Sequence, residues 1–521
     1  MEQPRDTNAR AGGFLVQGAE HDRALWEHSV ADAAAGKLTG PFWSLADVAK
    51  EVGPDYIVSR RFPVVQGDDV RPCDDFLRSF VNRTAWCSRK LKLPRVDDFC
   101  LLAAALFGQG ASPRFWKVDH KSAYRQIPLR SSERKLAVIV FCHPESGELC
   151  YWVHDALPFG ALGAVYGYNR PARALVHLAR VLLHVPVDSY FDDYWGIECH
   201  QTVDSGFEAF KRLNNLLGFV MKESKERSPR TVGDILGLEV DISHLPLTVA
   251  VSAERIAHLR ALIEAVQEAG LLWPSTAGRL VGKLQFASSG IFGRVGRAAL
   301  QPLYRRQHAK KGSPSLSKHV RAALDFFLQL LADPPARVLP LGNARPPVVV
   351  YTDGNGAGCL GVVVFERGRP PLVVSCRVPQ AVLDLLVVRK QQIALIELIA
   401  VIVAFEVFAE AVRGRDVLLF VDNRTAEGVV RNGYARRAAH DACALASLLW
   451  LRCAALGVSL FVEWVPSEMN ISDGPSRPAE PAKSRDILSL SPVWRQLEVF
   501  PEAVERALRE DLGWPLRLRE A

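Results

Sequence analysis

The sequence lacks any long run of apolar residues that is free of charge. The closest candidate, residues 393–412, contains Glu397, Glu406 and Glu410. A helix that crosses a membrane needs about 20 consecutive, predominantly apolar residues, so we expect no membrane span and no membrane partner. The first thirty residues also lack the apolar segment of a secretory signal. We therefore expect an intracellular protein, of the cytoplasm or the nucleus, that is not secreted.

Metal-binding spacings of cysteine and histidine are absent too. None of the ten cysteines stands in a C-x-x-C pair, and no H-E-x-x-H motif occurs. These absences argue against a thiolate zinc site and against a histidine-based one. In a chain of this size, the scattered cysteines are typical of reduced, mostly buried thiols.

The composition excludes a wholly disordered chain, because 49% of the residues are hydrophobic and only 23% are charged. At roughly 100–200 residues per domain, 521 residues predict two to four domains. The net charge of +7 is compatible with a nucleic-acid partner but does not by itself require one.

The chain changes character several times along its length. We interpret it as a loose N-terminal leader (1–40), a long mixed region (41–304), a connector rich in proline and basic residues (305–345), a compact region (346–480) and a helical tail (481–521). The compact region is expected to contain strands near 348–351, 360–365 and 372–376, a helix over 388–412, and strands near 417–421 and 460–464. This order predicts an α/β domain.

Acidic residues stand at the ends of two apolar strand candidates. Residues 115–118 lead into Asp119, and residues 186–191 lead into Asp192 and Asp193. Adjacent carboxylates in an apolar hairpin repel each other and are costly to desolvate. A divalent cation removes that penalty, and oxygen ligands of this kind suit Mg²⁺. Taken alone, the Asp-Asp pair is better explained as a solvated hairpin turn.

The sequence around these acids resembles that of reverse transcriptases. D-H-K-S-A-Y-R-Q-I-P at 119–128 is similar to the first catalytic motif of retroelement polymerases, and Y-F-D-D at 190–193 is similar to their Y-x-D-D box. L-P-F-G at 157–160 matches the motif beside the incoming nucleotide. Residues 70–82 are similar to the fingers segment, and residues 218–284 carry later motifs and a thumb-like helix. The motifs follow one another in the family's order.

This resemblance implies a two-metal polymerase site. Asp119 and Asp192 would hold two Mg²⁺ ions with Asp193 beside them, and Mn²⁺ is an alternative ion. One ion would lower the pKa of the primer 3′-hydroxyl, and the other would neutralise the triphosphate and the departing pyrophosphate. Lys225 would act as a general acid for the pyrophosphate. A solvated lysine is the alternative interpretation of Lys225.

The resemblance also implies four nucleotide contacts. Arg71 would grip the triphosphate through a forked contact, with a surface arginine as the alternative. Tyr124 would pack under the sugar and exclude a ribose 2′-hydroxyl, with a core tyrosine as the alternative. Phe159 and Gly160 would lie beside the nucleotide. In an extended strand, Tyr124 would face away from Asp119, so we expect the chain to bend between them.

Four further acids follow with a different spacing. Their local strings are T-D-G at Asp353, E-L-I-A at Glu397, V-D-N at Asp422 and N-I-S-D-G-P-S-R at Asp473. A glutamate inside an apolar helix is costly unless it is exposed or bound to something. Together the acids resemble the D-E-D-D set of ribonuclease H. That resemblance implies two Mg²⁺ ions that activate water against the RNA strand of an RNA/DNA hybrid. For each acid alone, a surface position is the alternative.

Two features are interpreted as structural. G-x-G-x-x-G at 356–361 matches a dinucleotide-binding fingerprint, but it runs into the β pattern of 362–365 and not into a helix. We therefore expect a hairpin turn there. His120 follows Asp119 directly, and we expect its side chain to point away from the acids.

We thus expect an α+β right-hand polymerase with fingers, palm and thumb, followed by an α/β ribonuclease H-like domain. The whole resembles the Pol reverse transcriptase and ribonuclease H of DIRS-type or Ty3-like retroelements. Its partners would be an RNA template, a DNA primer, dNTPs and RNA/DNA hybrids, contacted through dispersed basic residues. One alternative is a domesticated or decaying copy that binds nucleic acid without catalysis. A second is an RNA-templated RNA polymerase, against which Tyr124 and the ribonuclease H-like acids argue.

Overall fold

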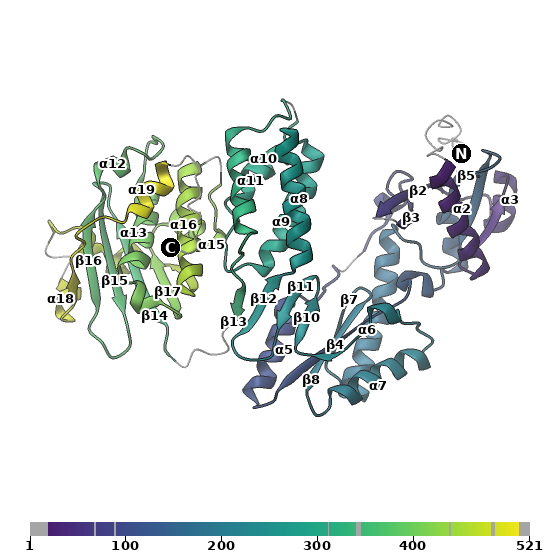
Figure 1. Cartoon of the computed structure of the whole chain (residues 1–521), viewed down its shortest axis with the longest axis horizontal. Coiled ribbons are helices and arrows are strands. Elements are labelled where there is room, and N and C mark those ends of the chain that lie inside the picture. Colours follow the sequence, from purple (N-terminus) through teal and green to yellow (C-terminus); the bar gives the residue numbers. More distant parts are fainter. Residues whose placement is uncertain are drawn as a thin grey trace. The chain divides into compact units, whose positions relative to one another are not determined.

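The computed structural model describes residues 19–66, 69–87, 90–310, 312–339, 345–436, 439–480 and 485–509. The chain is a mixed α/β protein that divides into two compact units, Met1–Thr231 and Val232–Ala521 (Figure 1). The division therefore falls inside the long mixed region that the sequence predicted for 41–304.

A five-stranded sheet with the order β1-β6-β5-β2-β3 lies in the first unit. Its strands are β1 (Leu38–Phe42), β2 (Val58–Gln66), β3 (Asp69–Asp74), β5 (Val138–Cys142) and β6 (Leu149–His154), accompanied by α2 (Ala19–Ala34) and α3 (Leu45–Val52). β2 and β5 are parallel, and the other neighbours are antiparallel.

The prediction of a loose leader is wrong for residues 19–40. They form α2 and the start of β1, because Leu25 of α2 is buried with Ile139, Phe141 and Trp152 of the sheet. Alanine and charged residues conceal this short apolar face from a composition-based interpretation. Residues 1–18, the rest of the expected leader, lie outside the described residues.

An antiparallel four-stranded sheet with the order β7-β8-β4-β9 completes the first unit. Its elements are β4 (Pro113–Asp119), β7 (Val187–Tyr190), β8 (Asp193–Cys199) and β9 (Arg227–Arg230), with α4 (Val81–Thr84), α5 (Val96–Gly108), α6 (Leu162–Leu182), α7 (Val203–Leu216), η1 (Ala123–Gln126), η2 (Ser131–Leu136) and η3 (Glu223–Lys225).

Helices cover both faces of this sheet. Side chains alternate between the faces of a strand, so Trp116 packs against Phe210 of α7 whereas Phe115 packs against Phe99 of α5. Tyr168 of α6 is buried in the same cluster as Trp116. The carboxylates at the ends of β4 and β8 are thus supported by large, fully buried aromatic residues.

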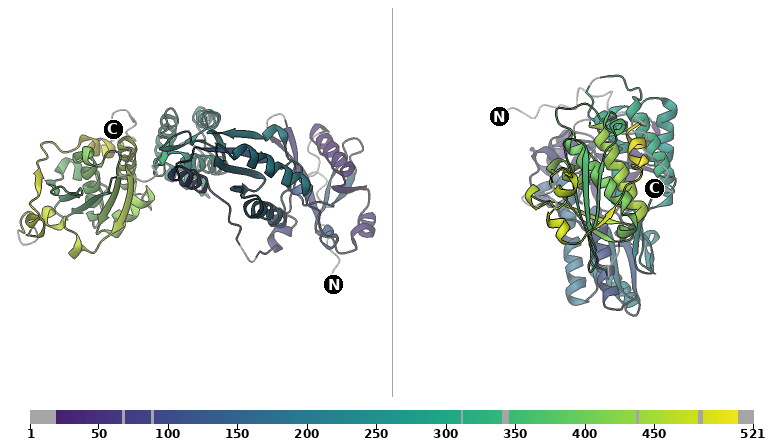
Figure 2. Two further views of the ribbon diagram at one scale, coloured as in Figure 1. Left: turned by 90° about the horizontal axis from the view of Figure 1, so that it is seen from below. Right: turned by 90° about the vertical axis from the view of Figure 1, so that its left-hand side faces the viewer.

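The second unit begins with an antiparallel sheet, in the order β10-β11-β12-β13, and four helices. These are β10 (Val232–Ile235), β11 (Leu238–Asp241), β12 (Leu247–Val251) and β13 (Arg337–Leu339), with α8 (Ala253–Ala269), α9 (Pro274–Ala287), η4 (Ser288–Gly290), α10 (Leu300–Gln307) and α11 (Lys318–Leu330). Each long helix contacts two of the others, and together they form a bundle (Figures 1 and 2).

The prediction of a connector over 305–345 is wrong for its middle part, residues 318–339, which contain a helix and a strand. α11 is capped by Ser317 and buries Leu324 and Phe327 in the bundle, and β13 pairs with β12. Flanking prolines and lysines suggested a linker, but the apolar face of 318–330 requires a packed helix. Residues 311 and 340–344 of this stretch lie outside the described residues.

A six-stranded sheet, with the order β18-β17-β14-β15-β16-β19, follows. Its strands are β14 (Val348–Gly354), β15 (Cys359–Phe365), β16 (Leu372–Arg377), β17 (Asp416–Val421), β18 (Ser459–Trp464) and β19 (Val493–Arg495). Its helices are α12 (Gln380–Leu383), α13 (Ile393–Val407), α14 (Ala409–Val412), α15 (Arg424–Asn432), α16 (His440–Leu456), α17 (Asp473–Ser476), α18 (Arg485–Ser489) and α19 (Glu502–Arg509).

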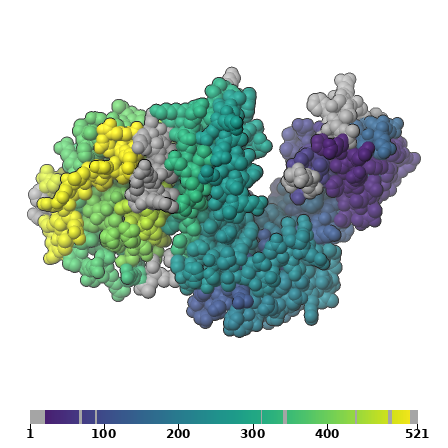
Figure 3. All heavy atoms as spheres, in the orientation of Figure 1, coloured from purple at the N-terminus to yellow at the C-terminus, as the bar shows by residue number. Residues whose placement is uncertain are grey.

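The strand and helix order predicted for 346–480 is confirmed, with the long helix beginning at Ile393 and not at residue 388. The hairpin expected at 356–361 is also confirmed, because β14 and β15 pair antiparallel across it. The tail is not purely helical, since β19 pairs with β16 and α19 packs on α16 at the surface (Figure 3). Residues 481–484 and 510–521 of the tail lie outside the described residues.

Among the described residues, no helix combines the length and the apolarity that a membrane span requires.

Candidate active sites

The acids of the first unit lie on neighbouring strands. Asp119 ends β4 and pairs in register with Asp193, the first residue of β8. Asp192 lies in the tight turn between β7 and β8, and its carbonyl accepts a hydrogen bond from the amide of His120 at 3.2 Å. Phe191 of this turn adopts a left-handed conformation with φ 53°. The two sequence motifs therefore meet at one edge of the sheet.

Two lysines bind these carboxylates. Nζ of Lys225 lies 2.6 Å from Oδ2 of Asp119, and Nζ of Lys117 lies 3.6 Å from Oδ2 of Asp193. Burial lowers the pKa of Lys225, but its hydrogen bond and attraction to Asp119 outweigh that effect and raise the pKa overall. Lys225 is about half exposed, so its side chain meets solvent as well as the carboxylate of Asp119.

Burial is the main reason why the pKa values of Asp192 and Asp193 are raised. The positive charge of Lys117 opposes this rise at Asp193. Asp119 is buried, Asp192 and Asp193 are partly buried, and closely spaced carboxylates of this kind are a donor set that a divalent cation stabilises. In the described structure, however, Asp119, Asp192 and Asp193 do not bring oxygens within 4.8 Å of one another as a group of three.

His120 points away from the acids, as expected. Its Nε2 lies 2.7 Å from Oδ1 of Asn214, its Nδ1 lies 2.8 Å from the hydroxyl of Tyr168, and its ring stacks on Phe219. The imidazole is therefore part of the packing beneath the carboxylates.

Tyr124 lies in the 3-10 turn η1, where the chain bends as expected after Ser122, whose φ is 54°. Its ring centroid is 5.3 Å from that of Phe159 and 5.1 Å from that of Tyr168. Burial, and secondly the negative charge of Asp192, raise the pKa of Tyr124 to about 12. The structure thus brings Tyr124 close to both Phe159 and the carboxylate turn.

The backbone around Gly160 leaves no space for a side chain. Its φ is 94°, and a Cβ there would lie 2.7 Å from the carbonyl oxygen of Asp74. Asn82 donates to the carbonyl of Gly160 at 2.8 Å and accepts from the amide of Leu162 at 2.7 Å. Arg71 occupies an exposed position on β3, in register with Val64.

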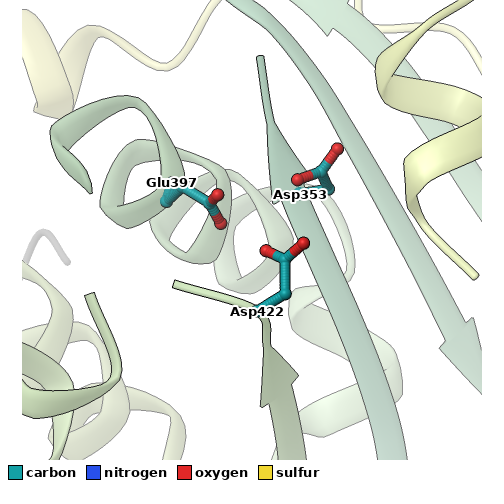
Figure 4. Close-up of side chains that lie close together, drawn as sticks. All are labelled: Asp353, Glu397 and Asp422. Carbon is teal, nitrogen blue, oxygen red and sulfur yellow. The ribbon is translucent and has the colours of Figure 1, made fainter. Parts of the chain in front are cut away.

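A second group of acids lies in the six-stranded sheet (Figure 4). Asp353 is the last but one residue of β14, Asp422 directly follows β17, and Glu397 lies on α13. Because β14 and β17 are parallel neighbours in register, their carboxyl ends bring Asp353 and Asp422 together. Oxygens of the three side chains lie within 4.8 Å of one another, the one such group of three among the described residues.

This triad has the properties of a cation site. Asp353 and Glu397 are only 2% and 3% exposed. Burial, followed by the charges of Asp422 and Asp353, raises the pKa of Glu397 to about 10. Oε2 of Glu397 and Oδ1 of Asp422 are buried and have no hydrogen-bond partner among the residues that the structure describes. Unsatisfied buried carboxylate oxygens are costly, and a divalent ion would satisfy them.

Asp473 lies beside the triad but is not part of the group of three. Its Oδ1 is 2.5 Å from Nη1 of Arg477, and its carbonyl accepts from the hydroxyl of Ser476 at 3.0 Å. The same hydroxyl also contacts Oδ2 of Asp353, so the two acceptors share its single proton. α17 therefore links the fourth acid of the sequence pattern to the first.

Several supporting residues were not identified from the sequence. Asn470 donates to the carbonyl of Thr352 at 3.1 Å, and the indole of Trp464 donates to the carbonyl of Asp422 at 2.8 Å. Asn470 and Ser476 belong to the N-I-S-D-G-P-S-R string, so their place in that motif was the available signal. No comparable pattern marked Trp464.

No model of a known protein family matches the sequence, and no curated protein matches it significantly. Solved structures of a foamy viral protease–reverse transcriptase are similar to parts of the chain. In complex with dsDNA, one form shows 14% identity, a TM-score of 0.45 and coverage of 83% of this chain and 68% of its own. Another dsDNA complex shows 13% identity and a TM-score of 0.46, and the match covers 87% of this chain and 84% of the other. The complex with an RNA/DNA hybrid shows 13% identity and a TM-score of 0.43, and the match covers 78% of this chain and 50% of the other. TM-scores of this size do not establish a common fold.

Proposed function

We propose that the chain is an RNA- and DNA-directed DNA polymerase of a retroelement, with a ribonuclease H that cleaves the RNA strand of RNA/DNA hybrids. We assign the five-stranded sheet to the fingers, the β7-β8-β4-β9 sheet to the palm, α8–α11 to the thumb, and the six-stranded sheet to the ribonuclease H-like domain. A DIRS-type or Ty3-like lineage and an intracellular location form part of this proposal.

The observation that carries the proposal is the register of Asp119 against Asp193, with Asp192 in the adjoining turn. Two motifs about seventy residues apart in the sequence meet there, as a polymerase site requires. Bound divalent ions, Mg²⁺ or Mn²⁺, would supply charge stabilisation at the triphosphate and lower the pKa of the attacking hydroxyl. Asp119, Asp192 and Asp193 would hold these ions.

The chain's own side chains would then position the nucleotide. The ring of Tyr124, packed between Phe159 and Tyr168, would exclude a ribose 2′-hydroxyl. Arg71 would bind triphosphate oxygens in a bidentate contact. Lys225, whose ammonium group is bound to Asp119 in the described structure, would donate a proton to the departing pyrophosphate.

The nuclease half rests on Asp353, Glu397 and Asp422. Their buried, partly unsatisfied oxygens form a donor set for divalent ions, and Asp473 would complete it from α17. Divalent ions held there would activate water for attack on a phosphodiester. Ser476 would orient the carboxylate of Asp353 through its hydrogen bond.

One observation favours a second candidate, a retroelement copy that binds nucleic acid without polymerising. Lys225 and Lys117 bind two of the three palm acids, which do not converge as a group. In that case the lysines would act as permanent counter-ions, and basic residues elsewhere would contact phosphates without catalysis.

Primer extension distinguishes the two candidates. The full chain is given an RNA template, a DNA primer, Mg²⁺ and dNTPs or rNTPs, and is compared with Asp192→Asn and with Asp204→Asn, an exposed acid of α7. We expect dNTP-dependent extension that Asp192→Asn abolishes and Asp204→Asn retains. Extension that survives Asp192→Asn, or no extension by the native chain, would refute the polymerase.

Hybrid cleavage tests the nuclease separately. Asp422→Asn should abolish cleavage of the RNA strand, whereas Asp416→Asn, at the other end of β17, should retain it. Equal cleavage by the two variants would refute the nuclease assignment.

A further inference from the structure

A network of buried charged side chains lies in the first unit, outside the carboxylate sites. Its five members come from five separate elements: Asp32 of α2, Arg61 of β2, Asp74 of β3, Arg125 of η1 and His154 of β6. All except Asp32 are less than 9% exposed. Buried charges are costly unless they are paired and hydrogen-bonded, and each member of this network has such a partner within it.

Asp74 forms one end of the network. Nε and Nη2 of Arg61 donate to its two carboxylate oxygens at 2.8 Å and 3.2 Å. Nη1 of the same guanidinium donates to the hydroxyl of Ser29 at 2.9 Å. Nε2 of His154 lies 2.9 Å from Oδ2 of Asp74. The carboxylate at the end of β3 is therefore held from both β2 and β6.

Arg125 forms the other end. Its Nη1 lies 2.5 Å from Nδ1 of His154 and donates to the carbonyl of Ala156 at 3.3 Å. Its Nη2 donates to Oδ2 of Asp32 at 2.9 Å and to the carbonyl of Lys37 at 3.2 Å. A guanidinium has donors only, so Nδ1 of His154 accepts, and the proton of the ring is on Nε2, where it donates to Asp74.

The charge state and the hydrogen-bond directions of the network follow from these contacts. Two arginines are balanced by two aspartates, and the neutral imidazole of His154 connects the pairs. Burial, opposed by the contact with Asp74, lowers the pKa of His154 to about 4. A guanidinium from η1 is thus joined through one imidazole to a carboxylate of β3.

The network joins the three segments that carry the proposed nucleotide contacts. Arg125 directly follows Tyr124, Ala156 directly precedes the L-P-F-G segment, and Asp74 ends the strand of Arg71. The carbonyl oxygen of Asp74 also lies 2.7 Å from the position that a Cβ on Gly160 would take. The network therefore connects all three segments.

Gln126, which directly follows Arg125, is also fixed by hydrogen bonds. The side chain of Gln126 donates to the carbonyls of Lys121 and Val220 at 2.7 Å and 2.9 Å, and accepts from the amide of Val220 at 2.8 Å. η1 is thus fastened to the five-stranded sheet by Arg125 and to the palm by Gln126. The ring of Tyr124 projects from a turn whose next two residues are both anchored.

We propose that Arg125 is a positioning residue for sugar selection, which sets the place of the Tyr124 ring through its buried contacts with Asp32, His154 and Ala156. The inference rests on the proposed polymerase function. Steric exclusion of one hydroxyl depends on the position of the ring to within about 1 Å, and a displacement of that size can change a rate by about 100-fold. Among the described side chains of this network, only Arg125 joins η1 to β6; backbone hydrogen bonds from Leu157 to Ile127 and from Leu129 to Asp155 join the segments that follow these two elements.

The test measures kcat/KM of the full chain for a dNTP and the matching rNTP on an RNA template with Mg²⁺. Arg125→Met should lower the dNTP/rNTP ratio by about tenfold or more, and Asp32→Asn should lower it less, because the hydrogen bond is retained. Arg134→Met is the matched control: Arg134 is also ion-paired in the first unit, at 2.8 Å to Glu51 and 2.7 Å to Asp155, but it contacts no proposed nucleotide residue. It should leave the ratio unchanged.

A second comparison separates positioning from general damage. In a Tyr124→Val background, Asp32→Asn and Arg125→Met should cause no further change in the ratio, since the ring that they position is gone. If Arg125→Met fails to fold, as a changed urea-unfolding curve would reveal, Arg125→Lys and Asp32→Asn carry the same expected direction.

The outcomes are distinguishable. A native chain that extends primers, together with unchanged ratios in the Arg125 and Asp32 variants, would overturn the positioning role and leave the polymerase intact. Equal loss of selectivity in Arg134→Met would also overturn it. A native chain that incorporates no nucleotide would overturn the proposed function, and the positioning role with it.

Discussion

The ammonium group of Lys225 lies 2.6 Å from Oδ2 of Asp119, joining η3 to the end of β4. These residues are more than a hundred positions apart in the chain, and each was selected from the sequence for a different part of one reaction. Lys225 is half exposed, whereas Asp119 is buried. The lysine can therefore leave the carboxylate for solvent or substrate without unpacking the core.

Removal of Lys225 should slow the chemical step of nucleotide incorporation. If its ammonium group protonates pyrophosphate, Lys225→Ala should lower kcat by about 100-fold with little change in KM. Single-turnover primer extension measures this. Lys211→Ala, which removes another lysine of the first unit that is ion-paired at 2.8 Å to Glu226, should retain the native rate. A normal single-turnover rate for Lys225→Ala would exclude the acid role.

Glu397→Gln should abolish hybrid cleavage and weaken the response of stability to divalent ions. A ligand that binds only the folded state stabilises it by about 2.7 kcal/mol at a hundredfold excess over its dissociation constant. The native chain should therefore melt at a higher temperature in Mg²⁺ than in a chelator, and Glu397→Gln should reduce that difference. An unchanged Mg²⁺ effect on melting would show that the triad binds no ion.

The His154 network should make the protein less stable in acid. The pKa of His154 is lowered from 6.5 to about 4 in the folded chain, chiefly by burial, so below pH 6.5 the unfolded chain binds the proton more readily. The contribution of His154 to the free energy of unfolding is thus fully present above pH 6.5. It is lost as the pH falls towards 4, by up to about 3 kcal/mol.

His154→Gln provides the comparison, because an amide can donate to Asp74 and accept from Arg125 yet gains no proton. Urea unfolding at pH 7, 5.5 and 4.5 should show a shallower loss of stability for this variant than for the native chain. Parallel pH curves for the two proteins would assign the acid sensitivity to other groups.

Gly160→Ala should impair nucleotide binding and stability together. Its positive φ and the carbonyl of Asp74 leave no room for a methyl group, and a left-handed conformation alone costs an L-residue about 1–2 kcal/mol. KM for dNTPs should rise. Gly163→Ala, three residues on in α6, meets open space and should be neutral or slightly stabilising. Similar KM values for the two variants would contradict a role for Gly160 in the nucleotide site.

The amino-acid sequence was sufficient for features that depend on local pattern. Runs of β-branched and apolar residues predicted β14 to β18, and the apolar periodicity of 388–412 predicted the helix that the structure shows as α13. The acids that end such strands were recognisable because a carboxylate directly after an apolar run has to meet solvent, a cation or a counter-ion. Asp119, Asp353 and Asp422 are of this kind, and parallel pairing of β14 with β17 was enough to bring the last two together.

Only the tertiary structure revealed which buried charged residues, distant in the sequence, are paired with one another. In the sequence, Arg125 is one more basic residue of a motif, and Asp74 is one of two adjacent aspartates. Sequence spacing does not show that side chains from five separate elements contact one another. The same holds for α2 and α11, whose short apolar faces acquire meaning only when a sheet or a bundle covers them. Burial makes an unpaired charge costly, so the partner of each buried group is decided by the packing of the whole unit and not by its neighbours in the chain.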